Sequence, residues 1–202
     1  MLMNKAEKLL MNNPVRAAVQ RHYEARRLRA MGGVMAGGRA LEIGCGRGVG
    51  TEIVLKQFGA DKVDAFDLDA DMVRRAQARL KRFGDRVRLW TGDATDIRAD
   101  DETYDAVFDF GVIHHIPDWK AALREVHRVL KPGGRFYADE IYEKFIVHPL
   151  IRAFLDHPMR DRFDHARFTE ALEGAGLHVE ESYDEGHFGF FVARKAAAFR
   201  TS

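Results

Sequence analysis

Three glycines follow a short apolar run and could form a ligand-binding turn. Gly44, Gly46 and Gly48 alternate with other residues in the stretch LEIGCGRG, and a helical pattern begins directly after them. Glycine lets the backbone adopt positive φ and lets a ligand come close, and the first turn of the next helix offers free N–H groups. The third glycine of a dinucleotide-binding G-x-G-x-x-G pattern would fall at Val49. The turn therefore predicts a ligand site unlike that of dinucleotide enzymes, with a tight structural turn as the alternative.

Carboxylates stand on both sides of this turn. Glu42 lies two positions before the first glycine, and Asp67 ends the next apolar run, 19 positions after Gly48. A carboxylate at the end of the second strand can accept hydrogen bonds from both hydroxyls of a ribose. The spacing therefore favours a nucleoside ligand over a bare phosphate.

Two histidines and a glutamate could move a proton in the same region. His114 and His115 follow the fourth apolar run, and Glu140 ends the fifth, where the topology is expected to turn it toward the cleft. An imidazole with a pKa of about 6.5 suits proton transfer at neutral pH. We therefore take His115 and Glu140 as candidate catalytic residues, with ordering of the loop by the histidine ring as an equally good interpretation.

Alternating strand and helix patterns position these residues. Apolar runs predict strands at 40–43, 62–66, 86–90, 106–110 and 135–138, separated by helical patterns at 51–58, 70–83 and 119–130. This alternation implies right-handed crossovers and a mostly parallel sheet. A helix at 166–175 precedes two strands, 177–183 and 187–193, whose three-residue link permits only an antiparallel hairpin.

Five stretches in order resemble the class I S-adenosylmethionine-dependent methyltransferases: LEIGCGRG, VDAFDLD, TGDATDI, YDAVFDFGVIHHIPD and REVHRVLKPGGRFY. The resemblance covers roughly residues 39–140 and is closest to the small-molecule branch that includes the ubiquinone and menaquinone biosynthesis enzymes (methyltransferase type 11 domain). It implies a Rossmann-like α/β/α sandwich with a seven-stranded, mostly parallel sheet whose last strand is antiparallel. That topology agrees with the predicted hairpin.

The resemblance also implies which residues bind the methionine half of the cofactor S-adenosyl-L-methionine. The glycine turn passes beneath this half, and Glu42 holds the turn in place. Phe110 and Gly111, at the end of the fourth strand, lie next to the sulfonium. Cys45 is interpreted as a small packing residue in the crowded turn.

The adenosine half is expected at the second and third strands. Asp67 would hold the ribose diol and Leu68 would lie beside the adenine. Asp93 would accept from the adenine amino group, near the backbone N–H of Ala94. For Asp93 the alternative is that it caps a turn.

Composition and motifs limit the partners. The chain has 202 residues and a net charge of +1, which fits a single domain. Its one cysteine fits a reducing compartment. We expect the protein to be cytoplasmic, with neither signal peptide nor membrane-spanning helix. Methyltransferases of nucleic acid base amines resemble one another in a D/N-P-P-Y/F/W tetrapeptide, where this sequence has DFGV at 109–112. We therefore expect a small-molecule acceptor, no nucleic acid, and a monomer or homodimer.

Two segments outside the shared motifs should contact the acceptor. Residues 1–38 form an N-terminal extension, and residues 1–40 carry a net charge of +6. Asn13 is its expected helix cap, and its expected apolar face is Val15, Ala18, Val19, His22 and Tyr23. This helix could close over the cleft, bind an anionic membrane or an acidic substrate, or simply pack on the domain at 39–202. The second segment, 141–168, is expected to form a cap with a helix at 150–156; metal binding by His148, His157, Asp161 and His165 is disfavoured because Pro158 interrupts their spacing.

We therefore expect methyl transfer to a small molecule by in-line displacement, leaving S-adenosyl-L-homocysteine. The alternatives are a methyltransferase of lipid or quinone headgroups at the membrane surface, and a protein that binds the cofactor without turnover.

Overall fold

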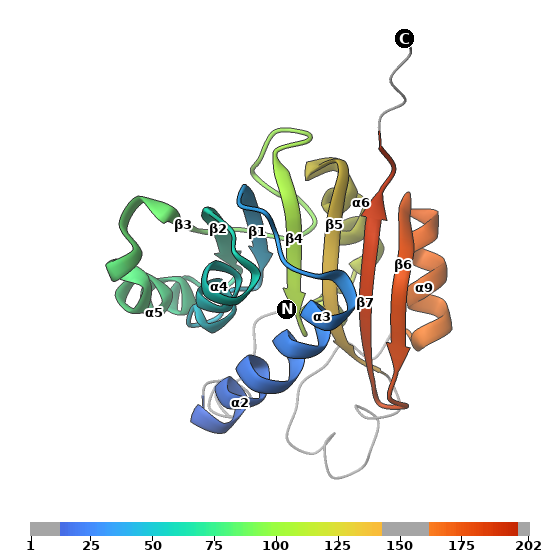
Figure 1. The fold of residues 1–202 in the computed structure, drawn as a ribbon, viewed down its shortest axis with the longest axis horizontal. Coiled ribbons are helices and arrows are strands. Elements are labelled where there is room, and N and C mark those ends of the chain that lie inside the picture. Colours follow the sequence, from blue (N-terminus) through green and yellow to red (C-terminus); the bar gives the residue numbers. More distant parts are fainter. Residues whose placement is uncertain (1–12, 143–161, 198–202) are drawn as a thin grey trace.

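A seven-stranded sheet forms the centre of the molecule (Figure 1). The computed structural model describes residues 13–142 and 162–197. The strand order is β3-β2-β1-β4-β5-β7-β6. The strands are β1 (Arg39–Ile43), β2 (Lys62–Asp67), β3 (Val87–Thr91), β4 (Tyr104–Phe110), β5 (Leu130–Ile141), β6 (Leu177–Asp184) and β7 (Phe188–Lys195). Only β7 runs antiparallel to its neighbours, β5 and β6, so the predicted topology is confirmed.

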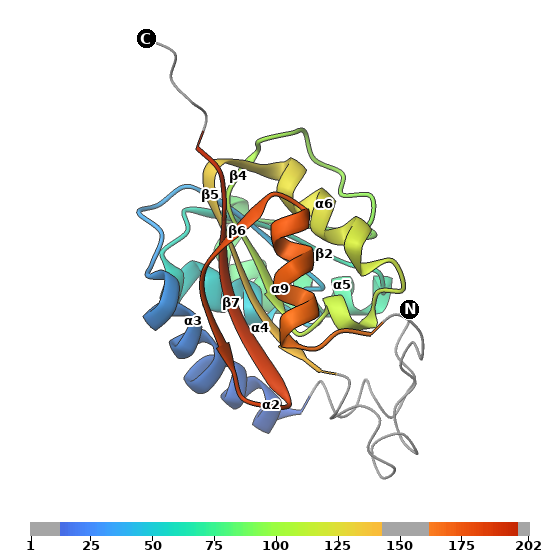
Figure 2. The same cartoon turned by 90° about the vertical axis from the view of Figure 1, so that its right-hand side faces the viewer.

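Helices cover both faces of the sheet (Figure 2). One face carries α2 (Pro14–Val19), the π-helix η1 (Gln20–Glu24), α3 (Ala25–Gly32), α4 (Val49–Ile53), the π-helix η2 (Val54–Phe58) and α5 (Ala70–Leu80), which a 3-10 turn extends (Lys81–Arg86). The other face carries α6 (Trp119–Val129) and α9 (His165–Gly174). A further 3-10 turn, η4 (Ile113–His115), follows β4. The sheet is thus the middle layer of an α/β/α sandwich.

Each face has its own hydrophobic core. Trp119 and Phe168 are buried against the β4–β5 region on the α6–α9 side. On the opposite side, the rings of Phe58, Phe108 and Tyr137 are packed together, with centroids 4.7 to 5.4 Å apart. Fully burying an aromatic side chain contributes about 1.5 to 3 kcal/mol, so these two layers hold the strand ends in register.

Side-chain caps begin the helices where the sequence predicts them. Asn13 accepts the N–H of Arg16 at 2.8 Å, and Asp69 accepts that of Asp71 at 2.8 Å. The predicted helix at 70–83 ends as an α-helix at Leu80, and the chain continues as a 3-10 turn in which Gly84 takes a positive φ of 54°. Strand β5 is longer than predicted: it extends from Leu130 to Ile141, with an irregular register against β4 between Leu130 and Arg135.

The buried face of the N-terminal helix differs from the prediction. Val15, Val19 and Tyr23 are 72%, 41% and 46% exposed, whereas Ala17 and Leu28 are buried. Most of the buried positions of this helix are alanine or glycine, which carry little hydrophobic signal, whereas its valines give a strong signal but are exposed. The hydrophobic pattern therefore selected the wrong face of this helix.

Parts of the second expected segment lie outside the described residues. The expected helix at 150–156 and the side chains of His148, His157 and Asp161 fall there. His165 is described: its ring hydrogen-bonds Tyr142 at 2.6 Å and Ser182 at 3.1 Å. Across residues 13–142 and 162–197, no group of three or more His, Cys, Asp or Glu side chains is placed to hold a metal ion, and no helix is long and apolar enough to cross a membrane.

Candidate functional site

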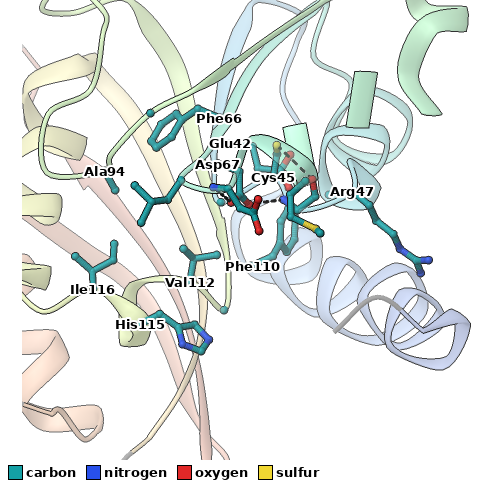
Figure 3. Close-up of a pocket in the computed structure, with 18 of the residues that line it drawn as sticks. Glu42, Cys45, Arg47, Phe66, Asp67, Ala94, Phe110, Val112, His115 and Ile116 are labelled. Atoms are coloured by element: carbon teal, nitrogen blue, oxygen red, sulfur yellow. Dashed lines mark hydrogen bonds between the residues drawn. The ribbon is translucent and has the colours of Figure 1, made fainter. Parts of the chain in front are cut away.

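A cavity of about 380 Å³ lies at the carboxyl ends of β1, β2 and β4 (Figure 3). Its walls come from the glycine turn, the segment after β2, the turn after β3 and the start of the N-terminal helix. Of the ten residues that the sequence assigns to the cofactor, only Gly48 does not border the cavity. The nine that do are Glu42, Gly44, Gly46, Asp67, Leu68, Asp93, Ala94, Phe110 and Gly111. Ligands of open parallel sheets bind at this edge, so the position is that of a binding site.

The three glycines of the turn have different structural roles. All take positive φ, of 67° at Gly44, 49° at Gly46 and 81° at Gly48. A Cβ atom on Gly44 would overlap Val112, and one on Gly48 would stand 2.7 Å from Leu80, so both are required for packing. A Cβ on Gly46 would meet nothing within 4 Å, which makes this glycine an open part of the cavity wall.

Asp67 ties the glycine turn to the end of β2. Its Oδ2 accepts the N–H of Gly46 at 2.8 Å, and its Oδ1 accepts the N–H of Asp69 at 2.8 Å. These two bonds fix the orientation of the carboxylate, which borders the cavity. Asp67 is thus positioned before any ligand binds.

Glu42 is a buried carboxyl group in the cavity wall. Its Oε2 accepts the hydroxyl of Thr51, and its carboxylate occupies the space that a side chain on Gly50 would need. Burial raises the pKa of Glu42 to about 8. The hydrogen bond from the Thr51 hydroxyl lowers this pKa, whereas repulsion from Asp67 and Asp109 raises it further. The group is therefore largely neutral at pH 7 and ionises most readily beside a positive charge.

The expected adenine side is more open. Leu68 is 44% exposed and Ala94 is buried. Asp93 accepts the N–H and the hydroxyl of Thr95, both at 2.9 Å through Oδ1, so it does cap a turn. It also borders the cavity, and the two interpretations of Asp93 are compatible.

The structure separates the two candidate catalytic residues. His115 borders the cavity together with Val112 and Ile116, as Figure 3 shows. Glu140 does not: it is 1% exposed and accepts the N–H groups of Ile113 at 2.7 Å and His114 at 3.3 Å. Its Oε2 also lies 2.6 Å from Nδ1 of His114. The expectation that Glu140 faces the cleft is wrong, because its carboxylate turns toward η4 and orders the turn that carries His115.

Sequence reasoning missed the role of Arg16. Arginine on an amphipathic helix is normally exposed, yet Arg16 borders the cavity and its side chain is 21% exposed. Ala17 and Gln20 border it too, so the N-terminal helix does close one side of the cleft. The partner of Arg16, Glu24, lies eight positions along the chain, and no short-range sequence signal connects them.

Further acidic groups lie behind the cavity wall. Asp109 and Asp139 are 0% and 7% exposed, and one oxygen of each has no hydrogen bond within the described structure. Burial, followed by repulsion from Glu140, holds the pKa of Asp109 well above its ordinary range. Burial and repulsion from Glu24 do the same for the pKa of Asp139. Perturbed carboxyls of this kind gather at functional sites.

The chain is similar in sequence to known methyltransferases. Residues 40–134 match the family described as "Methyltransferase domain". The chain is 30% identical to the fatty-acid O-methyltransferase of Mycolicibacterium smegmatis over 71% of its own length and 52% of the relative's. It is 36% identical to the demethylmenaquinone methyltransferase of Staphylococcus carnosus, over 50% and 42% of the two lengths. The chain thus spans about half the length of these relatives.

A solved structure shares the whole architecture. The S-adenosylmethionine-dependent methyltransferase from Aquifex aeolicus superposes with a TM-score of 0.74 at 19% identity, covering 96% of this chain and 99% of that one. The matched family segment contains the glycine turn, Asp67, Asp93 and the β4 end, which are the elements that build the cavity. Residues 40–134 therefore form a methyltransferase domain, on a fold shared with S-adenosylmethionine-dependent methyltransferases.

Proposed function

We propose that this protein transfers a methyl group from S-adenosyl-L-methionine to a small-molecule acceptor and releases S-adenosyl-L-homocysteine. One observation carries the proposal: the hydrogen bond from Gly46 N–H to Asp67 Oδ2 joins the glycine turn and a ribose-binding carboxylate in a single cavity wall. Nine of the ten residues assigned to the two halves of the cofactor border the same cavity, which supports the proposal.

The cavity fits such a ligand in size and chemistry. Its volume of about 380 Å³ lies within the usual range for small-molecule sites. Gly46 and Gly111 border it, and the absence of side chains there lets a ligand approach the backbone closely. Glu42 supplies a carboxyl that a positively charged ligand would ionise. In this proposal Asp67 holds the ribose, Leu68, Asp93 and Ala94 surround the adenine, and Glu42, Phe110 and Gly111 border the methionine half.

In this mechanism the protein acts mainly by positioning the cofactor and the acceptor. When bound, the cofactor would supply a methyl group activated by its positively charged sulfur, so that an acceptor atom attacking the methyl carbon in line would displace the neutral thioether of S-adenosyl-L-homocysteine. The chain's own residues orient the two reactants and exclude water, which can contribute several kcal/mol. His115 is the side chain in the cavity wall that can take the acceptor's proton on a ring nitrogen. Glu140 acts through the turn it orders and is a positioning residue.

The acceptor is proposed to be apolar with one nucleophilic group. Val112, Ile116 and Pro117 line the wall beside His115 and provide apolar contact. Two relatives are named for their acceptors, one as a fatty-acid O-methyltransferase and the other as a demethylmenaquinone methyltransferase. We therefore propose the same class of acceptor here.

Calorimetric titration tests the cofactor assignment. The purified chain is titrated with S-adenosyl-L-methionine and, in parallel, with NADH. Asp67→Ala should weaken binding of S-adenosyl-L-methionine by about 1 to 3 kcal/mol through lost hydrogen bonds. Asp71→Ala, an exposed carboxylate two residues beyond the Asp69 cap, is the control and should leave binding unchanged. A preference for NADH, or no binding of either ligand, would refute the proposal.

A further inference from the structure

Arg16 projects from the N-terminal helix into the wall of the cavity. Its Nη1 lies 2.8 and 2.7 Å from the two carboxylate oxygens of Glu24. Burial opposes the charge on Arg16, but attraction to Glu24 and Asp139 raises its pKa above the usual value. The guanidinium is thus a permanent cation, fixed in position through one of its nitrogens.

The other end of the guanidinium faces the region of Gly111. Nη2 of Arg16 lies 3.9 Å from the place where a Cβ on Gly111 would stand, and it has no hydrogen bond to the described residues. Gly111 takes a positive φ of 74° and has no side chain, so nothing of its own fills the space in front of Nη2. Both residues border the cavity.

The second arginine of the cavity wall differs. Arg47 donates from Nη2 to the backbone oxygen of Asn13 at 2.9 Å. Figure 3 shows its side chain extending away from the central group of Glu42, Asp67 and Phe110. Arg16 is therefore the better-placed cation for a ligand that lies against Gly111.

We propose that Arg16 is a carboxylate-binding residue of the cavity, holding a ligand carboxylate through Nη2 while Glu24 holds Nη1. Guanidinium groups bind carboxylates through planar, charge-assisted hydrogen bonds. Glu24 balances one charge and orients the group without covering its second nitrogen. The carboxylate belongs either to the methionine half of the cofactor or to an acidic acceptor, so this inference rests on the proposed function.

Ligands that differ by one carboxylate separate these sources. The whole chain is titrated with S-adenosyl-L-homocysteine and with 5′-methylthioadenosine, which keeps the adenosine and the thioether but lacks the amino acid. Octanoate is then titrated into protein saturated with S-adenosyl-L-homocysteine. Loss of the charge-assisted bonds should weaken binding of the affected carboxylate about 10- to 100-fold.

Three variants are compared with the unmodified chain. Arg16→Gln removes the cation, and Arg16→Gln/Glu24→Gln removes it without leaving a buried unpaired carboxylate. Arg26→Gln, an exposed arginine on α3, is the matched control. Melting temperatures of all variants show that the chain is folded in each titration.

Each outcome decides the proposal. Weaker binding of S-adenosyl-L-homocysteine with unchanged 5′-methylthioadenosine assigns the methionine carboxylate to Arg16, and weaker octanoate binding alone assigns an acceptor carboxylate. Equal losses for both adenosine ligands, or no loss for any ligand, overturn the proposal and leave the proposed function standing. If the unmodified chain binds neither adenosine ligand, the proposed function itself fails, together with the role of Arg16.

Discussion

Replacing Glu42 by Gln should stabilise the protein, and increasingly so as the pH rises. Burial raises the pKa of Glu42 from 4.5 to about 8, so the folded chain binds more protons than the unfolded chain between these values. The contribution of Glu42 to the free energy of unfolding then falls as the pH rises through this window. It is fully present only below the pKa that the group has in the unfolded chain. Gln is neutral throughout and carries no such dependence.

The size of the effect follows from the shift. For a group with these two pKa values, the linkage integrates to about 4 kcal/mol between about pH 5 and about pH 9, as an upper limit. The new amide N–H needs an acceptor, and if it lacks one the cost is about 1 to 3 kcal/mol at every pH. The quantity to compare is therefore the change with pH of the difference in unfolding free energy.

Urea unfolding of the ligand-free chain at acid, neutral and alkaline pH measures that change. Glu52→Gln is the matched control, because Glu52 is surrounded by Arg21, Lys56, Arg79 and Arg82. Although burial opposes them, Lys56, Arg82 and Arg21 lower the pKa of Glu52, so its contribution to stability is present at neutral pH and is lost as the pH falls. The two variants should differ from the parent with opposite pH trends, and a Glu42→Gln curve parallel to the parent would refute the reasoning.

Three further outcomes are expected. Affinity for S-adenosyl-L-methionine relative to its uncharged thioether product should rise with pH up to about 8, because the sulfonium favours ionised Glu42; calorimetry should show no such rise in Glu42→Gln. Gly50→Ala should lower the free energy of unfolding by about 1 to 3 kcal/mol, since a Cβ there overlaps the Glu42 carboxylate, whereas Gly174→Ala, with open space around it, should be neutral or stabilising by up to about 1 kcal/mol in the same denaturation assay. Glu140→Ala should lower the free energy of unfolding by roughly 3 kcal/mol, because it leaves buried N–H groups and His114 without their acceptor. Glu140→Gln should lower it less, and equal losses in the two variants would contradict the role of Glu140 as an acceptor.

The sheet and the glycine turn were predictable because their signals are local. Apolar runs separated by helical patterns identify β1, β2 and β4, and a cap residue such as Asp69 marks the start of its helix. The three-residue link before β7 forces an antiparallel pair, whatever the rest of the chain does. Asp67 could be placed beside the turn because parallel strands end at a common edge.

The N-terminal helix was not predictable in the same way. Its buried side uses small residues, and Gly32 lies so close to Tyr137 that a Cβ would overlap the ring, while the Tyr137 hydroxyl donates to the Gly32 oxygen at 2.9 Å. Small residues carry little hydrophobic signal, and the π-helical segment at Gln20–Glu24 breaks the helical period. The inward position of Arg16 depends on Glu24, which lies within that segment.

Among the described carboxyl groups whose pKa is shifted, the direction of the shift depends on location. Carboxyls with lowered pKa values belong to ion pairs or backbone contacts away from the wall of the cavity: Glu52, Asp105, Glu125, Glu173 and Glu180. Carboxyls with raised pKa values, where burial is the largest cause, lie at or behind the cavity: Glu24, Glu42, Asp109, Asp139 and Glu140. A raised carboxyl pKa lowers stability at neutral pH. The fold thus concentrates its electrostatic cost at one end of the sheet, where a bound cation would offset it, and this is the pattern expected when the cost serves binding.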